Sequence, residues 1–130
     1  MPESRQERVL ASFARWNAGD RTPLLNEFHP DVEIHTAFGD AFSGRPFRGH
    51  EGVGQWMAAL DENFERWDLL VDSVAERDGE LVVRGRISAR ARASGLEMDQ
   101  AVNWIFRFQD DLVIYMRSWF GSAEEPSDVE

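Results

Sequence analysis

The chain has no cysteine, little positive charge and no long apolar run, and each of these absences excludes a class of function. Without cysteine, disulfides, thiolate nucleophiles and zinc–thiolate sites are excluded. The formal net charge of −10 argues against nucleic-acid or anionic-membrane partners, because both bind basic surfaces. No apolar run approaches the ~20 residues that span a bilayer, and the charged start at 1–8 differs from a signal peptide. We therefore expect a cytoplasmic protein.

The 130 residues fit one domain, and 42% of them are hydrophobic, which suffices for one core. We expect this domain at 1–121, followed by an acidic, disordered tail at 122–130. No glycine-rich phosphate loop is present, and Ala41 replaces the glycine that a nucleophile elbow at Ser43 requires. The three histidines lack the fixed spacing of a metal site. We therefore predict neither a metal nor a cofactor.

The first half of the chain has mainly helical patterns. Apolar residues recur at helical spacing over 3–18 and 50–67, so we expect a helix in each segment and an ion pair from Glu62 to Arg66. Thr22-Pro23 predicts the start of a short helix between them, because proline is tolerated in a first helical turn. Alternating apolar and polar residues then predict a half-buried strand at 31–36.

The segment that follows this strand, 37–49, is rich in aromatic residues. It contains Phe38, Phe42 and Phe47 among its glycines, which is more than a merely solvated linker requires. We interpret it as a lid.

The last part of the chain has the pattern of a four-strand meander, with strands at 68–77, 81–92, 96–108 and 112–120. Two-residue turns are expected between them, at Asp78-Gly79, Ser94-Gly95 and Asp110-Asp111. Long strands that follow helices form a curved sheet with a pocket.

Charges indicate how these strands pair. Setting Arg90 opposite Asp99 and Arg92 opposite Glu97 brings opposite charges together on one face of the sheet, which we take as the outer face. The inner face is then almost wholly apolar and aromatic, and Gly85 lies opposite a tryptophan with room for its indole. The few polar members of that face are Gln100, Tyr115 and Arg117.

An inner face of this kind predicts a small apolar ligand. The residues expected to bind it are Trp16, Thr36, Phe38, Trp56, Gln100, Trp104 and Trp119. The tryptophans have a second interpretation as ordinary core residues, because tryptophan contributes the largest buried area.

Four residues are candidates for catalysis: His35, Asp40, Tyr115 and Arg117. Tyr115 and Arg117 would stabilise developing negative charge, with His35 or Asp40 as the base. Two alternatives stay open. A histidine on the outer side of its strand is typical of a solvated or interface residue. An inward Arg117 needs either a carboxylate, Asp40 or Glu27, or an oxygen of a ligand.

Four short motifs occur in order along the chain, FARWNAGD at 13–20, FHPDVE at 28–33, FRGHEGV at 47–53 and IFRF at 105–108. Together they resemble a SnoaL-like member of the nuclear transport factor 2 and ketosteroid isomerase superfamily. The resemblance implies a cone-shaped α+β fold, in which a strongly curved mixed sheet wraps N-terminal helices around one apolar pocket. It also implies a homodimer through the outer sheet face.

The resemblance leaves the activity open. The catalytic acids of the family's isomerases and cyclases correspond to Thr36 and Trp104, and neither side chain is an acid. One hypothesis is a cofactor-independent enzyme, an isomerase, cyclase or lyase, that moves protons on a small apolar carbonyl or polycyclic compound. The other is a non-catalytic dimeric module for binding or interaction.

Overall fold

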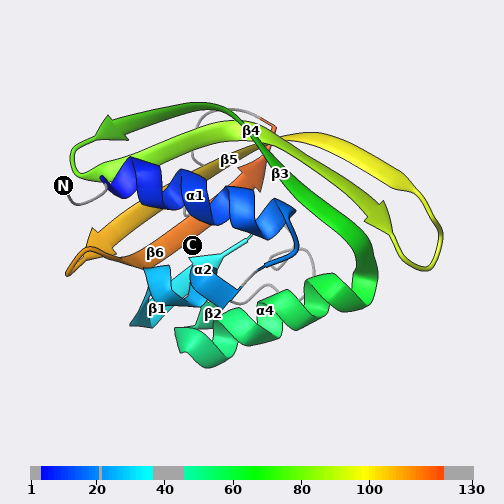
Figure 1. The fold of residues 1–130 in the computed structure, drawn as a ribbon, viewed down its shortest axis with the longest axis horizontal. Helices are drawn as coiled ribbons and strands as arrows, with labels where there is room; N and C mark the ends of the chain where they lie inside the picture. The colour runs from blue at the N-terminus through cyan, green and yellow to red at the C-terminus, as the bar shows by residue number, and fades with distance from the viewer. Residues whose placement is uncertain (1–3, 21, 37–45, 122–130) are drawn as a thin grey trace, which may run out of the picture.

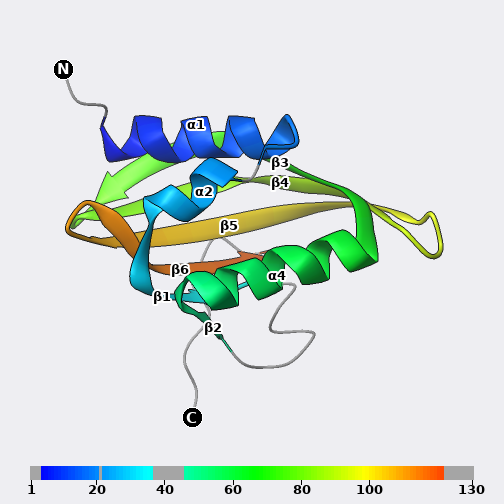
Figure 2. The same cartoon turned by 60° about the horizontal axis from the view of Figure 1, so that its bottom comes forward.

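The computed structural model describes residues 4–20, 22–36 and 46–121. In chain order the elements are α1 (Arg5–Asn17), α2 (Thr22–Glu27), β1 (Phe28–His35), β2 (Phe47–Arg48), α4 (Gly49–Asn63), β3 (Phe64–Arg77), β4 (Glu80–Ala91), β5 (Glu97–Gln109) and β6 (Leu112–Phe120). The helices lie on one side of a strongly curved sheet (Figures 1 and 2). We call the sheet face toward the helices the inner face. This is the α+β architecture that the sequence predicts.

The six strands form one sheet in the order β2-β1-β6-β5-β4-β3. β1 runs parallel to β6, and every other neighbouring pair is antiparallel. The sheet is therefore mixed, and its last four strands form the predicted meander. Asp78 and Gly79 turn the first hairpin with φ of 53° and 82°, which suits a type I′ turn.

Helix α1 confirms the first predicted helix, and a capping box fixes its start. The Ser4 hydroxyl accepts from the Glu7 amide at 3.1 Å, and the Glu7 carboxylate accepts from the Ser4 amide at 3.1 Å. The helix buries Val9, Phe13 and Trp16, as its apolar spacing predicts.

Helix α4 ends earlier than predicted, at Asn63, and residue 64 already belongs to β3. Arg92, from the loop after β4, explains this end. Its amide bonds to the Asn63 carbonyl at 2.9 Å, and its guanidinium donates to the carbonyls of Asp61 and Phe64 at 3.1 Å. These bonds satisfy carbonyls that a longer helix would use itself.

The helical ion pair predicted within 50–67 is consequently wrong. Arg66 lies on β3, where its guanidinium donates to the Ser88 hydroxyl at 2.7 Å and pairs with Asp68 at 3.3 Å. Trp67 is buried as expected, but it belongs to β3 and not to the predicted helix. Apolar residues at 60, 64 and 67 suit a helix as well as a strand that enters the core, so their spacing does not locate the boundary.

Strand β1 starts at Phe28, three residues before the predicted start. A register irregularity against β6 between Phe28 and Glu33 accommodates Pro30, which cannot donate to a ladder. The predicted alternation is confirmed, since Val32, Ile34 and Thr36 are buried between half-buried neighbours. Most of the predicted lid, 37–45, lies outside the described residues, as does the predicted tail at 122–130.

The pairing of β4 with β5 keeps the predicted faces but is shifted by two residues. Arg90 lies opposite Glu97, and Asp99 forms its ion pair with Arg86 at 2.6 Å. The cause is a longer loop. Because Arg92 leaves the sheet to bind the end of α4, the Ala91 amide closes the loop on the Leu96 carbonyl at 2.8 Å, in place of a two-residue turn.

Gly85 therefore faces Val102 and not Trp104. A different neighbour explains the glycine. A Cβ atom at this position would lie 1.8 Å from the Leu70 carbonyl oxygen on β3, next to a register shift of that strand.

The pairing of β5 with β6 contains a bulge that the sequence analysis did not predict. Phe108 faces Val113 as expected, but Arg107 faces Tyr115, so Ile114 is an extra residue. Beyond the bulge, Trp104 lies opposite Ser118 and not opposite Arg117. The inward placement predicted for Tyr115, Arg117 and Trp119 is wrong for this reason.

Candidate ligand pocket

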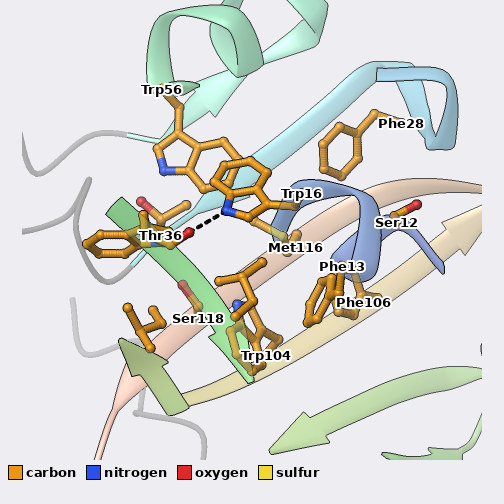
Figure 3. Close-up of a pocket in the computed structure, with 13 residues that line it drawn as sticks. Ser12, Phe13, Trp16, Phe28, Thr36, Trp56, Trp104, Phe106, Met116 and Ser118 are labelled. Atoms are coloured by element: carbon orange, nitrogen blue, oxygen red, sulfur yellow. Dashed lines mark hydrogen bonds between the residues drawn. The ribbon is translucent and has the colours of Figure 1, made fainter. Parts of the chain in front are cut away.

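A pocket lies between α1, α4 and the inner face of the sheet (Figure 3). Its walls are mostly aromatic, and seven segments of the chain contribute to them. The lining residues are Ser12, Phe13, Trp16, Phe28, Thr36, Trp56, Trp67, Leu69, Ile87, Trp104, Phe106, Met116 and Ser118. The curvature of the sheet positions the pocket, because residues of β1 near one end of the sheet and of β3 at the other end line the same space.

The pocket is narrow. About 530 Å³ of space free of atoms lies within it and its mouth, but the centre of a water-sized molecule can occupy only about 30 Å³. The space therefore takes only a few waters. A larger molecule enters only if lining side chains move.

Aromatic contacts hold these walls. The Trp16 and Trp56 rings stack with centroids 5.4 Å apart and planes at 27°. Phe13 meets Trp104 edge-on at 5.1 Å. The Trp16 indole also donates to the Trp67 backbone carbonyl at 2.7 Å, drawn as the dashed line in Figure 3. These pairs stabilise the fold and give the pocket flat surfaces suited to a planar ligand.

The polar groups of the described lining are neutral. They are the hydroxyls of Ser12, Thr36 and Ser118 and the indole N–H groups of the tryptophans. The Trp56 nitrogen is buried and has no hydrogen-bond partner among the described residues. None of the described lining residues is a Lys, Arg, His, Asp or Glu. Such a lining suits a neutral ligand, because burying an unpaired charge is costly.

The structure brings four of the predicted ligand-binding residues together, since Trp16, Thr36, Trp56 and Trp104 all line the pocket. Phe38 lies outside the described residues. Gln100 and Trp119 do not line the pocket. Gln100 is exposed on the β4–β5 hairpin, which reaches past the end of α4 (Figure 1). Trp119 lies opposite Asn103, beyond the bulge, on the outer face.

Sequence reasoning missed several lining residues, among them Ser12, Met116 and Ser118. Ser12 lies three residues after Val9 and four before Trp16, so the helical stripe that identified those residues also contains it. Met116 and Ser118 face inward only because of the bulge at residue 114, for which no sequence signal is apparent.

Three of the four catalytic candidates lie together, but on the outer face. The His35 and Tyr115 rings are 5.5 Å apart, and His35 pairs with Arg117 in the β1–β6 register. The Arg107 guanidinium lies 4.5 Å from the centre of the Tyr115 ring. Because Met116 and Ser118 line the pocket, their neighbours Tyr115 and Arg117 point away from it. Asp40 lies outside the described residues.

The same part of the outer face contains a perturbed carboxylate, Glu33. Its oxygens are 2.6 Å from His35 Nε2 and 3.1 Å from the Arg48 guanidinium. The hydrogen bond from His35, followed by the one from Arg48, holds the pKa of Glu33 below its ordinary value. Glu27, considered above as a partner of Arg117, instead pairs with Arg8 at 2.9 Å.

The described residues include no group of three or more His, Asp or Glu side chains that could hold a metal. The other two histidines are engaged in hydrogen bonds to the backbone. His50 Nε2 donates to the Phe28 carbonyl oxygen at 2.8 Å, and His29 Nδ1 accepts from the Asp31 amide at 2.9 Å. No helix in the described part of the chain is long and apolar enough to cross a membrane.

The family model of the SnoaL-like domain matches residues 9–116. The chain belongs to the SnoaL-like family. The match runs from the middle of α1 into β6, so it includes nearly all of the elements that build the pocket. No curated protein matches this SnoaL-like chain significantly.

Solved structures similar to this SnoaL-like chain have the same fold. An NTF2-like protein of unknown function from Burkholderia pseudomallei K96243 superposes with a TM-score of 0.82 at 19% identity, over 92% of each chain. TerC co-crystallised with polyporic acid gives 0.78 at 23% identity, over 90% of this chain and 91% of TerC. A putative SnoaL-like polyketide cyclase from Jannaschia sp. CCS1 superposes with a TM-score of 0.75 at 21% identity, over 92% of this chain and 90% of the cyclase. At such identities the likeness shows the fold alone, which is NTF2-like.

Proposed function

We propose that this SnoaL-like protein binds a small, apolar, carbonyl-containing molecule in the pocket between α1, α4 and the sheet. The observation that carries the proposal is the lining, which is aromatic and, among the described residues, offers only neutral hydrogen-bonding groups. TerC, which has the same fold, was crystallised with polyporic acid, and this supports a ligand with carbonyl groups and rings.

The shape of the pocket restricts the ligand further. A narrow space lined by aromatic rings favours a flat molecule over a bulky one. We propose fused bicyclic to tricyclic ketones as the size class, with small side-chain shifts on entry.

Turnover is a separate question, and the described lining argues against proton transfer by its own groups. Thr36 and Trp104 stand where the family resemblance implies acids, and a hydroxyl and an indole are poor general bases at neutral pH. Isomerase- or cyclase-like chemistry therefore needs a base from elsewhere, and Asp40 is the candidate that the sequence offers. We propose binding as the primary function.

Thermal unfolding with 1-indanone and 9-fluorenone as probes tests the binding proposal. We expect each probe to raise the Tm of the protein and to quench its tryptophan fluorescence in a saturable way, because four tryptophans line the pocket. If neither probe does so, the proposal is wrong.

Two neighbouring residues provide a matched pair of variants. Ser118→Leu fills the pocket from β6 and should abolish the rise in Tm on adding the probe. Arg117→Met changes the next side chain, which points to the other face, and should keep that rise. The opposite pattern would mean that Arg117, and not Ser118, faces the ligand.

We also propose that the protein forms a homodimer through the outer face of β3, β4 and β5. The outer face presents Leu70, which is 46% exposed, beside a row of exposed arginines, Arg84, Arg86 and Arg90. The family resemblance supports the same surface. A cytoplasmic location remains a prediction from the sequence.

A further inference from the structure

Two stacked tryptophans in the pocket differ in one respect. Trp16 and Trp56 pack against each other, yet only Trp16 has a protein acceptor for its indole N–H, the Trp67 carbonyl at 2.7 Å. The Trp56 side chain comes from the middle of α4 and is 8% exposed. Its nitrogen has less than 1 Å² of accessible surface and no partner among the described residues.

A buried N–H without an acceptor is uncommon in folded proteins, because it loses its bond to water and gains nothing in return. Such a group calls for a specific explanation. In Figure 3 the nitrogen edge of the Trp56 ring is turned toward Thr36, whose side chain also lines the pocket. The unpartnered donor therefore lies beside the pocket lining, and with less than 1 Å² of accessible surface it meets a ligand only when a neighbouring side chain moves on entry.

We propose that the indole N–H of Trp56 is the specificity-determining donor of the pocket, and that it binds the carbonyl oxygen of a neutral, planar ligand beside Thr36. This inference rests on the proposed function and names the group that would recognise the ligand's oxygen. A site built to hydrogen-bond one oxygen discriminates against the analogue that lacks it, because the donor is then left unpaired.

The charge of the ligand follows from the same lining. A carboxylate would need a cation, and the described lining residues include no Lys, Arg or His. One N–H donor among aromatic walls matches a ketone or quinone oxygen on a flat ring system. The oxygen accepts the hydrogen bond in the plane of the carbonyl, so ring and oxygen fit the same narrow space.

The pair 1-indanone and indane tests the donor, because the two molecules share the ring system and differ in the carbonyl oxygen. Dissociation constants for both are measured by calorimetry on the wild type and on Trp56→Phe, which keeps an aromatic ring and removes the N–H. We expect Trp56→Phe to shift the ratio of the two constants by about 3- to 10-fold in favour of indane, the value of one neutral hydrogen bond.

Trp104→Phe is the matched control, since it also replaces an indole of the lining but leaves Trp56 intact. It should weaken both probes by a similar factor and leave their ratio unchanged. An unchanged ratio in Trp56→Phe, or an equal shift in both variants, would overturn the donor role.

A second measurement does not depend on the variants being well folded. The wild type contains five tryptophans and so gives five indole N–H signals in a ¹⁵N–¹H spectrum. With Trp56 labelled selectively, its signal should move downfield with 1-indanone and much less with indane. Equal movement with both probes contradicts the donor role alone, whereas failure of both probes to bind the wild type contradicts the proposed function itself.

Discussion

At the scale of single residues, the pocket is built from groups that also hold the fold together. The Trp16 ring stacks on Trp56, and its N–H donates a hydrogen bond to the Trp67 carbonyl on β3. The Trp56 ring takes part in the same stack, but its N–H has no partner among the described residues. A residue that only packs has no need for a donor at this place, and phenylalanine would fill much of the same volume. This difference between the two indoles is why we assign Trp16 a structural role and propose a binding role for Trp56.

This difference predicts unequal effects on stability. Trp16→Phe removes a buried hydrogen bond and leaves the Trp67 carbonyl without this donor, whereas Trp56→Phe removes a donor that has no protein partner in the described structure. We expect Trp16→Phe to lower the free energy of unfolding by about 1 to 3 kcal/mol more than Trp56→Phe. Urea unfolding of both ligand-free variants measures this. Equal losses would show that the Trp16 hydrogen bond contributes no net stability.

Glu33 predicts how stability depends on acid. Its pKa is held below the ordinary value, about 4.5, by His35 and then Arg48, so folding favours its charged form. The contribution of Glu33 to the free energy of unfolding is fully present above pH 4.5, and it is lost as the pH falls through the lowered pKa. Glu33→Gln should therefore be less stable than the wild type at neutral pH, and the gap should close in acid.

His35→Phe is the companion variant, because it removes the larger of the two causes. It should move the acid-induced loss toward higher pH, and Arg48→Met should do so to a smaller extent. Thermal unfolding from pH 3 to 7, a range set by the ordinary carboxyl pKa, measures all three variants. A constant difference between Glu33→Gln and the wild type at every pH would show that this pairing does not contribute to stability.

At the scale of elements, the sequence predicts which face of a strand is buried better than it predicts which residues pair. Alternation depends on each strand's own side chains, and it correctly placed Glu97 and Asp99 outside and Ile87 and Trp104 inside. Pairing depends on loops and bulges, which depend on neighbours distant in sequence. The loop after β4 is long because Arg92 binds the end of α4.

The bulge in β6 had the larger consequence for the site. One extra residue, Ile114, exchanges the faces of every later side chain, so Met116 and Ser118 replace Tyr115 and Arg117 in the pocket. The inward placement of the tryptophans on α1, α4 and β5 was predicted correctly, because long regular patterns set the faces of these elements. The placement of Trp119, which follows the bulge, was not.

Gly85 shows how closely two strands approach at another irregularity. A Cβ atom there would lie 1.8 Å from the Leu70 carbonyl oxygen, a backbone atom that cannot rotate away. Gly85→Ala should therefore lower the free energy of unfolding by about 3 kcal/mol, near the upper end of the usual cost of overpacking. Chemical unfolding measures the loss.

Gly54→Ala is the control for this variant, since a Cβ atom on this helical glycine meets nothing within 4 Å. It should raise the free energy of unfolding by up to about 1 kcal/mol, because alanine favours the helix. A loss of less than about 1 kcal/mol in Gly85→Ala would mean that β3 and β4 separate easily at this point.

At the scale of the whole molecule, the two faces of the sheet have different chemistry. The inner face holds the aromatic pocket, whereas the outer face carries ion pairs such as Arg86 with Asp99 and Arg90 with Glu65. Exposed pairs of this kind contribute only about 0 to 1 kcal/mol each, so stability of the single chain does not account for them. We propose that a second copy of the chain, whose surface would carry both signs of charge, packs on this face.

The proposed homodimer leads to a prediction for Leu70, the exposed apolar residue on that face. In sedimentation at micromolar concentration the wild type should be a dimer. Leu70→Arg adds a cation to the surface that already holds Arg84, Arg86 and Arg90, so two copies should repel each other and the protein should sediment as a monomer. Leu96→Arg is the control, because Leu96 is 72% exposed in the loop after β4, away from the strand faces, and should leave the dimer intact. A wild type that sediments as a monomer, or a Leu70→Arg variant that stays dimeric, would exclude this face as the interface while leaving the pocket and its ligand untouched.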